Sequence, residues 1–292
     1  MKTAPNNRDN LRTMVRGAYD IQKLRIQMGN RIVGNFKAKL GQEAGETEDD
    51  SVDAEGKAIL ASLRAHYKKI ADGVAGFPRA KDFQGNGVID TYTELCLIAE
   101  YVELEDQEKK HFRRLTSVLE EFPIYVQFLE PIKGIGPAMA GVIVSEIDIT
   151  KARHPSSLWK YAGLDVASDG RGRSRKADHL VEKAYTNKDG DAAMRNSITF
   201  NPFLKTKLTG VLAGSFLKTT PNHYRDIYDG YKNRLESHPA HQEKSKLWRH
   251  NMAMRYMVKM FLIDLYVAWR TIEGLPVSLP YHEAKLGHRH AA

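Results

Sequence analysis

The chain has 292 residues, of which 42% are hydrophobic and 27% are charged, and its formal net charge is +8 at pH 7. This length and apolar content allow one large domain or two ordinary domains with buried cores, which excludes a chain that is disordered throughout. The single cysteine, Cys96, excludes an intramolecular disulfide and a cysteine-based zinc site, and its apolar neighbours predict a buried small side chain.

The excess of basic charge lies in the second part of the chain. Positions 131–292 contain 25 lysines and arginines against 15 acidic residues, whereas positions 1–130 contain 19 against 21. A basic surface favours a polyanion through counterion release, although many basic proteins bind none. The first ten residues form no apolar signal segment, and no apolar run reaches the roughly 18 residues of a membrane span. We therefore expect a cytoplasmic protein without a membrane partner.

A long amphipathic helix is predicted over positions 11–36. Apolar residues recur there at steps of three and four, as on one face of a helix. They are Leu11, Met14, Ala18, Ile21, Leu24, Met28, Ile32 and Phe36. Such a stripe packs against another helix, either in this chain or in a second copy. We therefore expect a helical bundle or coiled coil, and a homo-oligomer formed through these N-terminal helices.

The segments that follow continue the helical pattern with loops between them. Positions 41–56 are acidic and nearly free of large apolar residues, which predicts a loop. Helices are predicted over 58–70 and 90–121, on either side of a loop with four glycines at 73–88. No strand pattern stands out from this helical background. The chain is therefore predicted to be all-α, with a helical bundle or coiled coil at 1–127, a second domain at 128–276 and a tail at 277–292.

The helical pattern breaks sharply at "IKGIGPAMAGVIV", positions 132–144. The order of residues is typical of a helix-hairpin-helix, with two glycines that tolerate positive φ, an apolar plug between them, and a proline suited to the first helical turn. The free amides of such a hairpin bind a phosphate oxygen beside the positive end of the helix dipole. The predicted contacts to the DNA backbone are Lys133, Gly134, Ile135, Gly136 and Ala138. The alternative is a glycine turn between two packed helices.

Beyond the hairpin the chain continues "SEIDITKARHPSSLWKYAGLDVASDGRGRSRK". Over about 140 residues it resembles the helix-hairpin-helix transposase domain of the bridge-RNA-guided insertion-sequence serine recombinases. The blocks that carry this resemblance are 134–137, 146–149, 161–164, 168–170 and 188–195. The N-terminal helices are similar to the coiled-coil segment that precedes this domain in that family. The RuvC-like nuclease domain of the family has no counterpart in positions 1–130.

The resemblance implies a serine that attacks a DNA phosphodiester with cations nearby. The serine that matches the family's turn is Ser168, and Ser174 is the second choice. The implied nucleic-acid contacts in these blocks are Arg171, Arg173, Arg175, Lys176, Lys188 and Arg195. The turn is shorter than the family's and holds one serine where a Ser-Ser-Gly-Gly run is common. A flexible basic loop that touches nucleic acid and does no chemistry is therefore the alternative.

The favoured interpretation is a nucleic-acid-binding protein of a mobile element or phage, with DNA as its partner and structured RNA as a further candidate. The alternatives are an active serine recombinase, with a nuclease subunit in trans, and an oligomeric scaffold protein. No cofactor is implied, and Mg²⁺ is required only if that nuclease subunit acts.

Two other groups of residues are weighed and set aside. The histidines of the tail, His282, His288 and His290, do not predict a metal site because no carboxylate or cysteine cluster is fixed beside them. Basic residues of the last helical segments could line a nucleic-acid face, but for any single one a solvated helix surface is the simpler prediction. They are Arg234, Arg249, Arg255 and Lys259.

Overall fold

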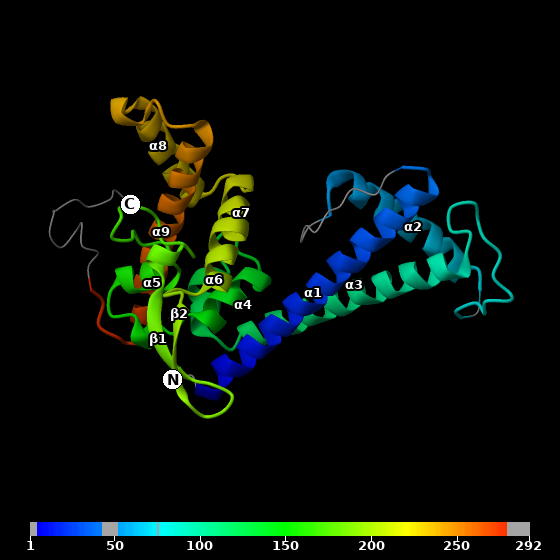
Figure 1. Ribbon diagram of the computed structural model, residues 1–292, viewed down its shortest axis with the longest axis horizontal. Coiled ribbons are helices and arrows are strands. Elements are labelled where there is room, and N and C mark those ends of the chain that lie inside the picture. The colour runs from blue at the N-terminus through cyan, green and yellow to red at the C-terminus, as the bar shows by residue number, and fades with distance from the viewer. Residues whose placement is uncertain (1–4, 43–51, 75, 279–292) are drawn as a thin grey trace. The chain divides into compact units, whose positions relative to one another are not determined.

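The computed structural model describes residues 5–42, 52–74 and 76–278 (Figure 1). The predicted all-α architecture is confirmed, with helices along most of the described chain. The helices of the first part are α1 (Pro5–Lys39), α2 (Ala54–Asp72) and α3 (Tyr92–Leu119). The second part contains α4 (Pro137–Glu146), α5 (Pro155–Tyr161), α6 (Pro202–Thr206), α7 (Ala213–Lys218), α8 (His223–Ser237) and α9 (Lys246–Ile272). Short π-helical turns at Tyr125–Leu129 and Lys207–Leu212 precede α4 and α7.

One element was not expected from the sequence. Strands β1 (Val181–Thr186) and β2 (Ala192–Ser197) form a two-stranded antiparallel ribbon, with Val181 opposite Ser197. Every residue of β1 is exposed, so neither face of the ribbon is buried against a core. Alternation of apolar and polar residues arises only where one face of a strand is buried. The ribbon therefore leaves no periodic signal in the sequence.

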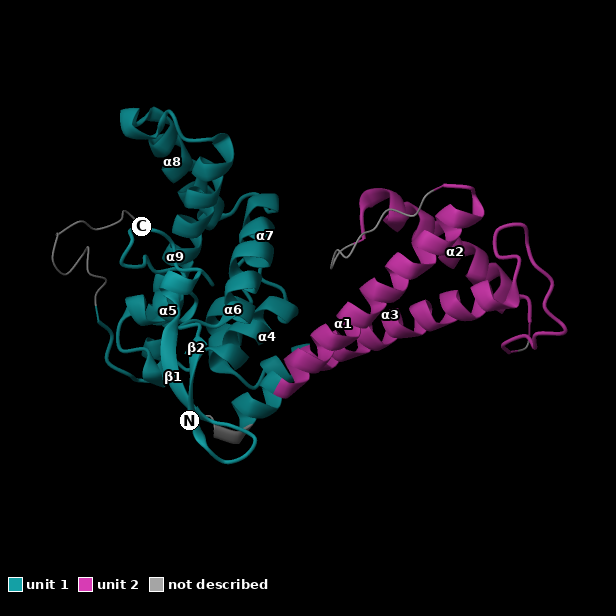
Figure 2. Cartoon of the chain, viewed as in Figure 1, with its two compact units in different colours: residues 1–12, 116–292 teal, residues 13–115 magenta. Residues whose placement is uncertain are grey.

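The chain divides into two compact units, coloured separately in Figure 2. One unit comprises residues 13–115, and the other comprises residues 1–12 and 116–292. The predicted domain boundary at position 127 stays a prediction, because compactness is a different property from independent folding.

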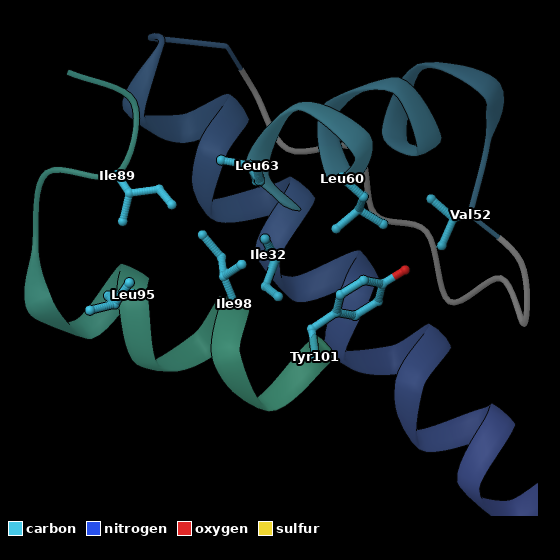
Figure 3. Packing of buried hydrophobic residues seen from close by; sticks show 8 residues of the cluster. All are labelled: Ile32, Val52, Leu60, Leu63, Ile89, Leu95, Ile98 and Tyr101. Atoms are coloured by element: carbon cyan, nitrogen blue, oxygen red, sulfur yellow. The ribbon is translucent and has the colours of Figure 1, made fainter. Parts of the chain in front are cut away.

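The core of the unit 13–115 is a cluster of buried side chains from α1, α2, α3 and the segments before α2 and α3 (Figure 3). Its members are Ile32, Val52, Leu60, Leu63, Ile89, Leu95, Ile98 and Tyr101. Met28 and Phe36 of the predicted stripe pack against this cluster, whereas Leu24 is 54% exposed. This end of the stripe thus packs within a single chain. The homo-oligomer stays a prediction.

The predicted acidic loop, 41–56, lies mostly outside the described residues, at 43–51. Helix α2 begins at Ala54, before the predicted end of this loop, because Asp53 caps it. The carboxylate of Asp53 accepts a hydrogen bond from the amide of Gly56 at 2.6 Å. An N-cap of this kind satisfies one of the unpaired amides at a helix start. Most of the predicted C-terminal tail, residues 279–292 with its three histidines, also lies outside the described residues.

The core of the other unit is built around α4 and α9. From Met139 to the end of α4 every residue is buried, and the ring of Phe261 on α9 contacts the rings of Phe216 and Tyr224 at centroid distances of 5.7 and 5.4 Å. Buried Arg270 of α9 donates hydrogen bonds to the carbonyls of Ile149 and Ala152. These contacts hold α7, α8 and the segment after α4 against α9.

Candidate nucleic-acid interface

The segment predicted as a helix-hairpin-helix forms a tight turn between the helical turn Tyr125–Leu129 and α4. Its carbonyl oxygens face the protein. The carbonyl of Gly134 accepts a hydrogen bond from the hydroxyl of Ser215 at 2.7 Å, and the carbonyl of Lys133 accepts one from the amide of Asn222 at 2.7 Å. These two carbonyl groups therefore connect the turn to α7 and to the residue that precedes α8.

The two glycines of this turn serve different purposes. Gly134 has φ +97°, and a Cβ at this position would lie 3.1 Å from the ring of Phe216, so only glycine fits without strain. Gly136 has an ordinary extended backbone, and no heavy atom lies within 4 Å of the place where its Cβ would be. Between them Ile135 is buried, as the hairpin prediction requires.

The amide groups on the exposed side of the turn have no acceptor. Among the described residues, neither the amide of Gly136 nor that of Ala138 donates a hydrogen bond to a backbone or side-chain group. Lys133 beside them is exposed. Donors at the start of a helix attract an anion because the helix dipole adds to their partial positive charge. The arrangement at α4 has the donors, the open space and the cation that a phosphate oxygen needs.

The segment that contains Ser168 and the basic residues after it includes a small closed turn at 165–173. The amide of Ala167 donates to the carbonyl of Arg171 at 2.7 Å, and the amide of Arg173 donates to the carbonyl of Asp165 at 3.1 Å. Gly170 at the tip has φ +75°. The segment is thus an ordered hairpin in its own right.

The basic residues of this turn differ in how they are used. The guanidinium of Arg173 forms an ion pair with Asp165 at 2.8 Å, which raises the pKa of Arg173, so its charge is neutralised within the protein. In contrast, the remaining three predicted contacts of the turn are exposed; they are Arg171, Arg175 and Lys176.

The remaining predicted contacts lie on the β-ribbon. Lys188 is exposed in the turn between the strands, and the guanidinium of Arg195 on β2 lies 4.9 Å from the centroid of the Tyr185 ring. Both residues are available to solvent on an element that has no core of its own. They extend the basic surface but are not brought into contact with the hairpin residues by any described interaction.

The two candidate serines have different surroundings. Ser168 is exposed, and among the described residues its hydroxyl has no hydrogen-bond partner. The hydroxyl of Ser174 lies 2.9 Å from Nδ1 of His179, and Nε2 of the same ring lies 3.2 Å from a carboxylate oxygen of Asp169. His179 is only 3% exposed. A serine, a histidine and an aspartate are therefore connected in series.

The protonation of His179 follows from its neighbours. The amide of Ser174 donates to Nδ1 at 2.9 Å, so this nitrogen carries a lone pair and the proton of the neutral ring is on Nε2, where it faces Asp169. The pKa of Asp169 is lowered by the amide of Arg171 and by His179, which keeps it ionised as the acceptor. The hydroxyl of Ser174 lies within hydrogen-bond distance of the same nitrogen. His179 and Asp169 were not singled out from the sequence, because their contact depends on how the turn folds back.

Other basic side chains, from α6 and α9, lie close to the 165–173 turn. The ammonium of Lys205 donates to the carbonyl of Arg173 at 2.5 Å, and the guanidinium of Arg255 packs against Gly172, where a Cβ would lie 2.3 Å from one of its nitrogens. Lys259 lies one helical turn beyond Arg255. The sequence indicates only surface charges at the two α9 residues, and it does not predict a role for Lys205, because no periodic or motif signal marks that position.

The block at 161–164 also has a structural explanation. Gly163 has φ +64°, and a Cβ there would lie 2.7 Å from the ring of Phe200. Glu146, in the block at 146–149, is buried and accepts hydrogen bonds from Arg12 at 3.0 Å and from Asn201 at 2.6 Å. These residues fix the framework around the turn and are not exposed to a ligand.

The described ranges also bear on metal binding and on membrane insertion. In residues 5–42, 52–74 and 76–278 no group of three or more histidine, cysteine, aspartate or glutamate side chains is arranged to hold a metal ion. Within the same ranges, every helix is too short or too polar to cross a membrane.

Comparison with known proteins places a family match on this region. Residues 126–201 match the model of the Transposase IS116/IS110/IS902 family. The match begins at the helical turn before the hairpin, includes α4, α5, the 165–173 turn and the β-ribbon, and ends at the N-cap of α6. No curated protein matches the chain. The chain therefore contains a transposase-like domain, related to the transposases of mobile elements, in which both predicted segments lie.

Proposed function

We propose that this chain is a DNA-binding protein of a mobile element or phage, and that the turn at 132–138 binds the sugar-phosphate backbone. The observation that carries the proposal is the pair of unsatisfied amides, at Gly136 and Ala138, beside exposed Lys133. Phosphate contacts of this kind position a protein on a duplex without reading its sequence. The basic excess of positions 131–292 supports the same partner.

The test is a substitution that blocks the amides without disturbing the fold. Gly136→Val places a side chain in open space at a position with φ −93°, so the fold should be retained. Gly134→Val is unsuitable, because its positive φ and the contact with Phe216 would unfold the turn. We expect Gly136→Val to weaken binding to random duplex DNA roughly tenfold, the value of one charge-assisted hydrogen bond.

The salt dependence of binding separates the amides from the lysine. Lys133→Met should lower the slope of log affinity against log salt concentration by about one, because one cation fewer neutralises a phosphate. Gly136→Val should leave that slope unchanged. Lys68→Met, on an exposed position of α2, is the matched control and should affect neither quantity. Unchanged affinity in a folded Gly136→Val variant would contradict the proposal.

A second candidate function is phosphoryl transfer by a serine, and the contact between Ser174 and His179 favours it. In that reaction the hydroxyl of Ser174 gives its proton to Nδ1 of His179 and its oxygen attacks a DNA phosphorus. One bond from phosphorus to a sugar oxygen breaks, and that oxygen takes the proton from Nδ1 of His179, which returns the ring to its neutral form. The resemblance to serine recombinases instead designates Ser168, which has no such base.

Covalent trapping distinguishes the two serines. A nicked duplex that loses its leaving strand should accumulate a protein–DNA product if either serine is a nucleophile. Loss of this product in Ser174→Ala, with retention in Ser168→Ala, would assign the reaction to Ser174, and the reverse result would assign it to Ser168. If DNA binds but no covalent product forms, only the DNA-binding function is supported. We expect this result if the reaction requires a separate nuclease subunit. Structured RNA as a second partner is tested by sequencing nucleic acid that copurifies with the protein.

A further inference from the structure

Two basic side chains contact the backbone of residues 164–173, and a third lies one helical turn further along α9. Arg255 and Lys259 project from successive turns of α9, and Lys205 projects from α6. Arg255 packs against the backbone of Gly172 and lies 3.5 Å from the carbonyl of Leu164, while Lys205 donates to the carbonyl of Arg173. All three side chains are partly buried. We call them the α6–α9 cation cluster.

Aromatic rings hold the two lysines of the cluster in place. The ammonium of Lys205 lies 4.6 Å from the centroid of the Phe200 ring, and that of Lys259 lies 5.1 Å from the centroid of the Trp159 ring. The indole of Trp159 also donates to the carbonyl of Lys259 at 3.2 Å, which fixes the ring against α9. A ring face attracts a cation but does not neutralise it. The cluster is thus ordered while its charge is retained.

The positive charge of the cluster is not balanced by carboxylates of its own. None of its three members forms an ion pair with any described residue. The nearby carboxylate of Asp165 is already bound by Arg173, through two hydrogen bonds of 2.8 and 3.1 Å to one of its oxygens. Burial, and then the charge of Arg255, lowers the pKa of both Lys205 and Lys259, and burial lowers that of Arg255. Like charges gathered in a partly dry site repel one another, so the protein without an anion stores this repulsion.

We propose that the α6–α9 cation cluster binds a phosphate group, and that the nucleic-acid backbone is its source. The guanidinium of Arg255 presents a planar fork of donors, and the ammonium groups of Lys205 and Lys259 add donors from two directions. This is the combination that suits a tetrahedral oxyanion with several acceptor oxygens. The choice of a nucleic acid as the source rests on the function proposed above, whereas the choice of phosphate rests on the cluster alone.

Binding at the cluster also determines the position of the turn. Lys205 and Arg255 contact the backbone at 172–173, directly before Ser174. A phosphate that draws these two cations together therefore holds the turn, and Ser174 with it, at a defined place on the nucleic acid. The site is separate from the hairpin at 132–138, so a duplex that engages both is fixed at two points.

The test measures inorganic phosphate and DNA separately. Inorganic phosphate is titrated into the full chain at constant ionic strength, with binding followed by calorimetry, and a random duplex is titrated in parallel. The variants are Lys205→Met and Lys259→Met, since Arg255 packs against Gly172 and its replacement risks misfolding. Lys246→Met, at an exposed position of the same helix, is the control. We expect phosphate binding by the wild type, a roughly tenfold loss in each cluster variant, and no change in the control.

The outcomes separate this inference from the proposed function. Absence of phosphate binding by the folded wild type, or equal binding by wild type and both cluster variants, overturns the cluster as a phosphate site, whatever the duplex does. Duplex binding that falls in the cluster variants and in Gly136→Val supports a nucleic-acid source. If phosphate binding requires the cluster but duplex binding is the same in the cluster variants and the wild type, the cluster is a phosphate site. The nucleic-acid backbone is then not the source of that phosphate.

Discussion

The paired cations of the unit 13–115 differ from the α6–α9 cation cluster of the other unit in what balances their charge. In the unit 13–115, Arg25 is bound by Glu108, Lys39 by Asp90 and Glu94, and Arg64 by Glu105. Burial lowers the pKa of Arg25, but the hydrogen bonds and charges of Glu108 and Tyr101 together raise it further than burial lowers it. In the other unit the three members of the α6–α9 cation cluster have no carboxylate of their own, and the pKa of each is lowered.

The difference indicates what each group of charges is for. A cation paired within the fold contributes to the specificity of helix packing and offers nothing to a ligand. A cation held by aromatic rings and backbone carbonyls, without a carboxylate, is costly in the free protein and gains most when an anion arrives. The first arrangement suits a structural unit, and the second suits a binding site, where stability is commonly reduced for function.

The largest effect is expected from breaking a pair in the unit 13–115. Glu108 is 9% exposed and accepts hydrogen bonds from both Arg25 and Gln22. Glu108→Ala leaves the guanidinium of Arg25 partly buried without a counterion, which we expect to lower the free energy of unfolding by about 3 kcal/mol. Urea denaturation followed by circular dichroism measures the loss.

A matched substitution on the same helix controls for helix propensity. Glu100→Ala replaces an exposed glutamate of α3 and should change stability by less than about 0.5 kcal/mol. Equal effects of the two substitutions would show that the Arg25–Glu108 pair is not an internal structural contact. Alanine is favourable in a helix, so the expected loss at Glu108 cannot be attributed to propensity.

A smaller effect is expected from removing the carboxylate beside the cation cluster. Asp165→Asn removes the charge that Arg173 binds and that also attracts the three cations of the cluster. We expect a loss of about 1 kcal/mol, less than at Glu108 because the surrounding cations remain partly hydrated. The sharper expectation concerns salt: phosphate should stabilise Asp165→Asn at least as strongly as the wild type. If phosphate no longer stabilises the Asp165→Asn variant, the phosphate site depends on the Arg173–Asp165 pair and not on the unpaired cations of the cluster.

The sequence predicted the elements that have a periodic or a motif signal. The stripe at 11–36, the helices at 58–70 and 90–121 and the glycine-rich loop between them all have counterparts in the described residues, as α1, α2, α3 and the segment before α3. Each depends on local spacing or composition, which a single chain displays directly. The bend at position 134 was recognised for the same reason, since a glycine with positive φ is a local requirement.

The parts that the sequence did not predict depend on contacts across the chain. His179 meets Asp169 and Ser174 only because the turn at 165–173 closes on itself, and Lys205 reaches that turn across 32 positions. The β-ribbon buries no face, so it shows no alternation. Arg173 was predicted as a nucleic-acid contact because it is basic, and only the structure shows that Asp165 holds it. Charge in a sequence does not distinguish a paired cation from a free one.

The smallest effect, and the most specific to the cluster, is a dependence of stability on pH. The folded-state pKa of Lys205 is lowered by burial and by Arg255, whereas in the unfolded chain it returns to the ordinary lysine value of about 10.4. Between these two values the unfolded chain binds more protons than the folded chain, so stability rises as pH rises through that window. Below both values the lysine is charged in both states, and the destabilisation is present in full.

Comparison with Lys205→Met isolates this contribution, because the tyrosines that titrate in the same range are common to both proteins. The stability of the wild type minus that of the variant should increase between pH 7 and pH 10, by about half a kcal/mol given the partial exposure of the site. Lys218→Met, at an exposed position of α7, should give a constant difference. A bound phosphate restores the ordinary preference for the charged form, so saturating phosphate should abolish the increase. A difference that falls with pH in the free protein would mean that Lys205 is a paired cation like those of the unit 13–115.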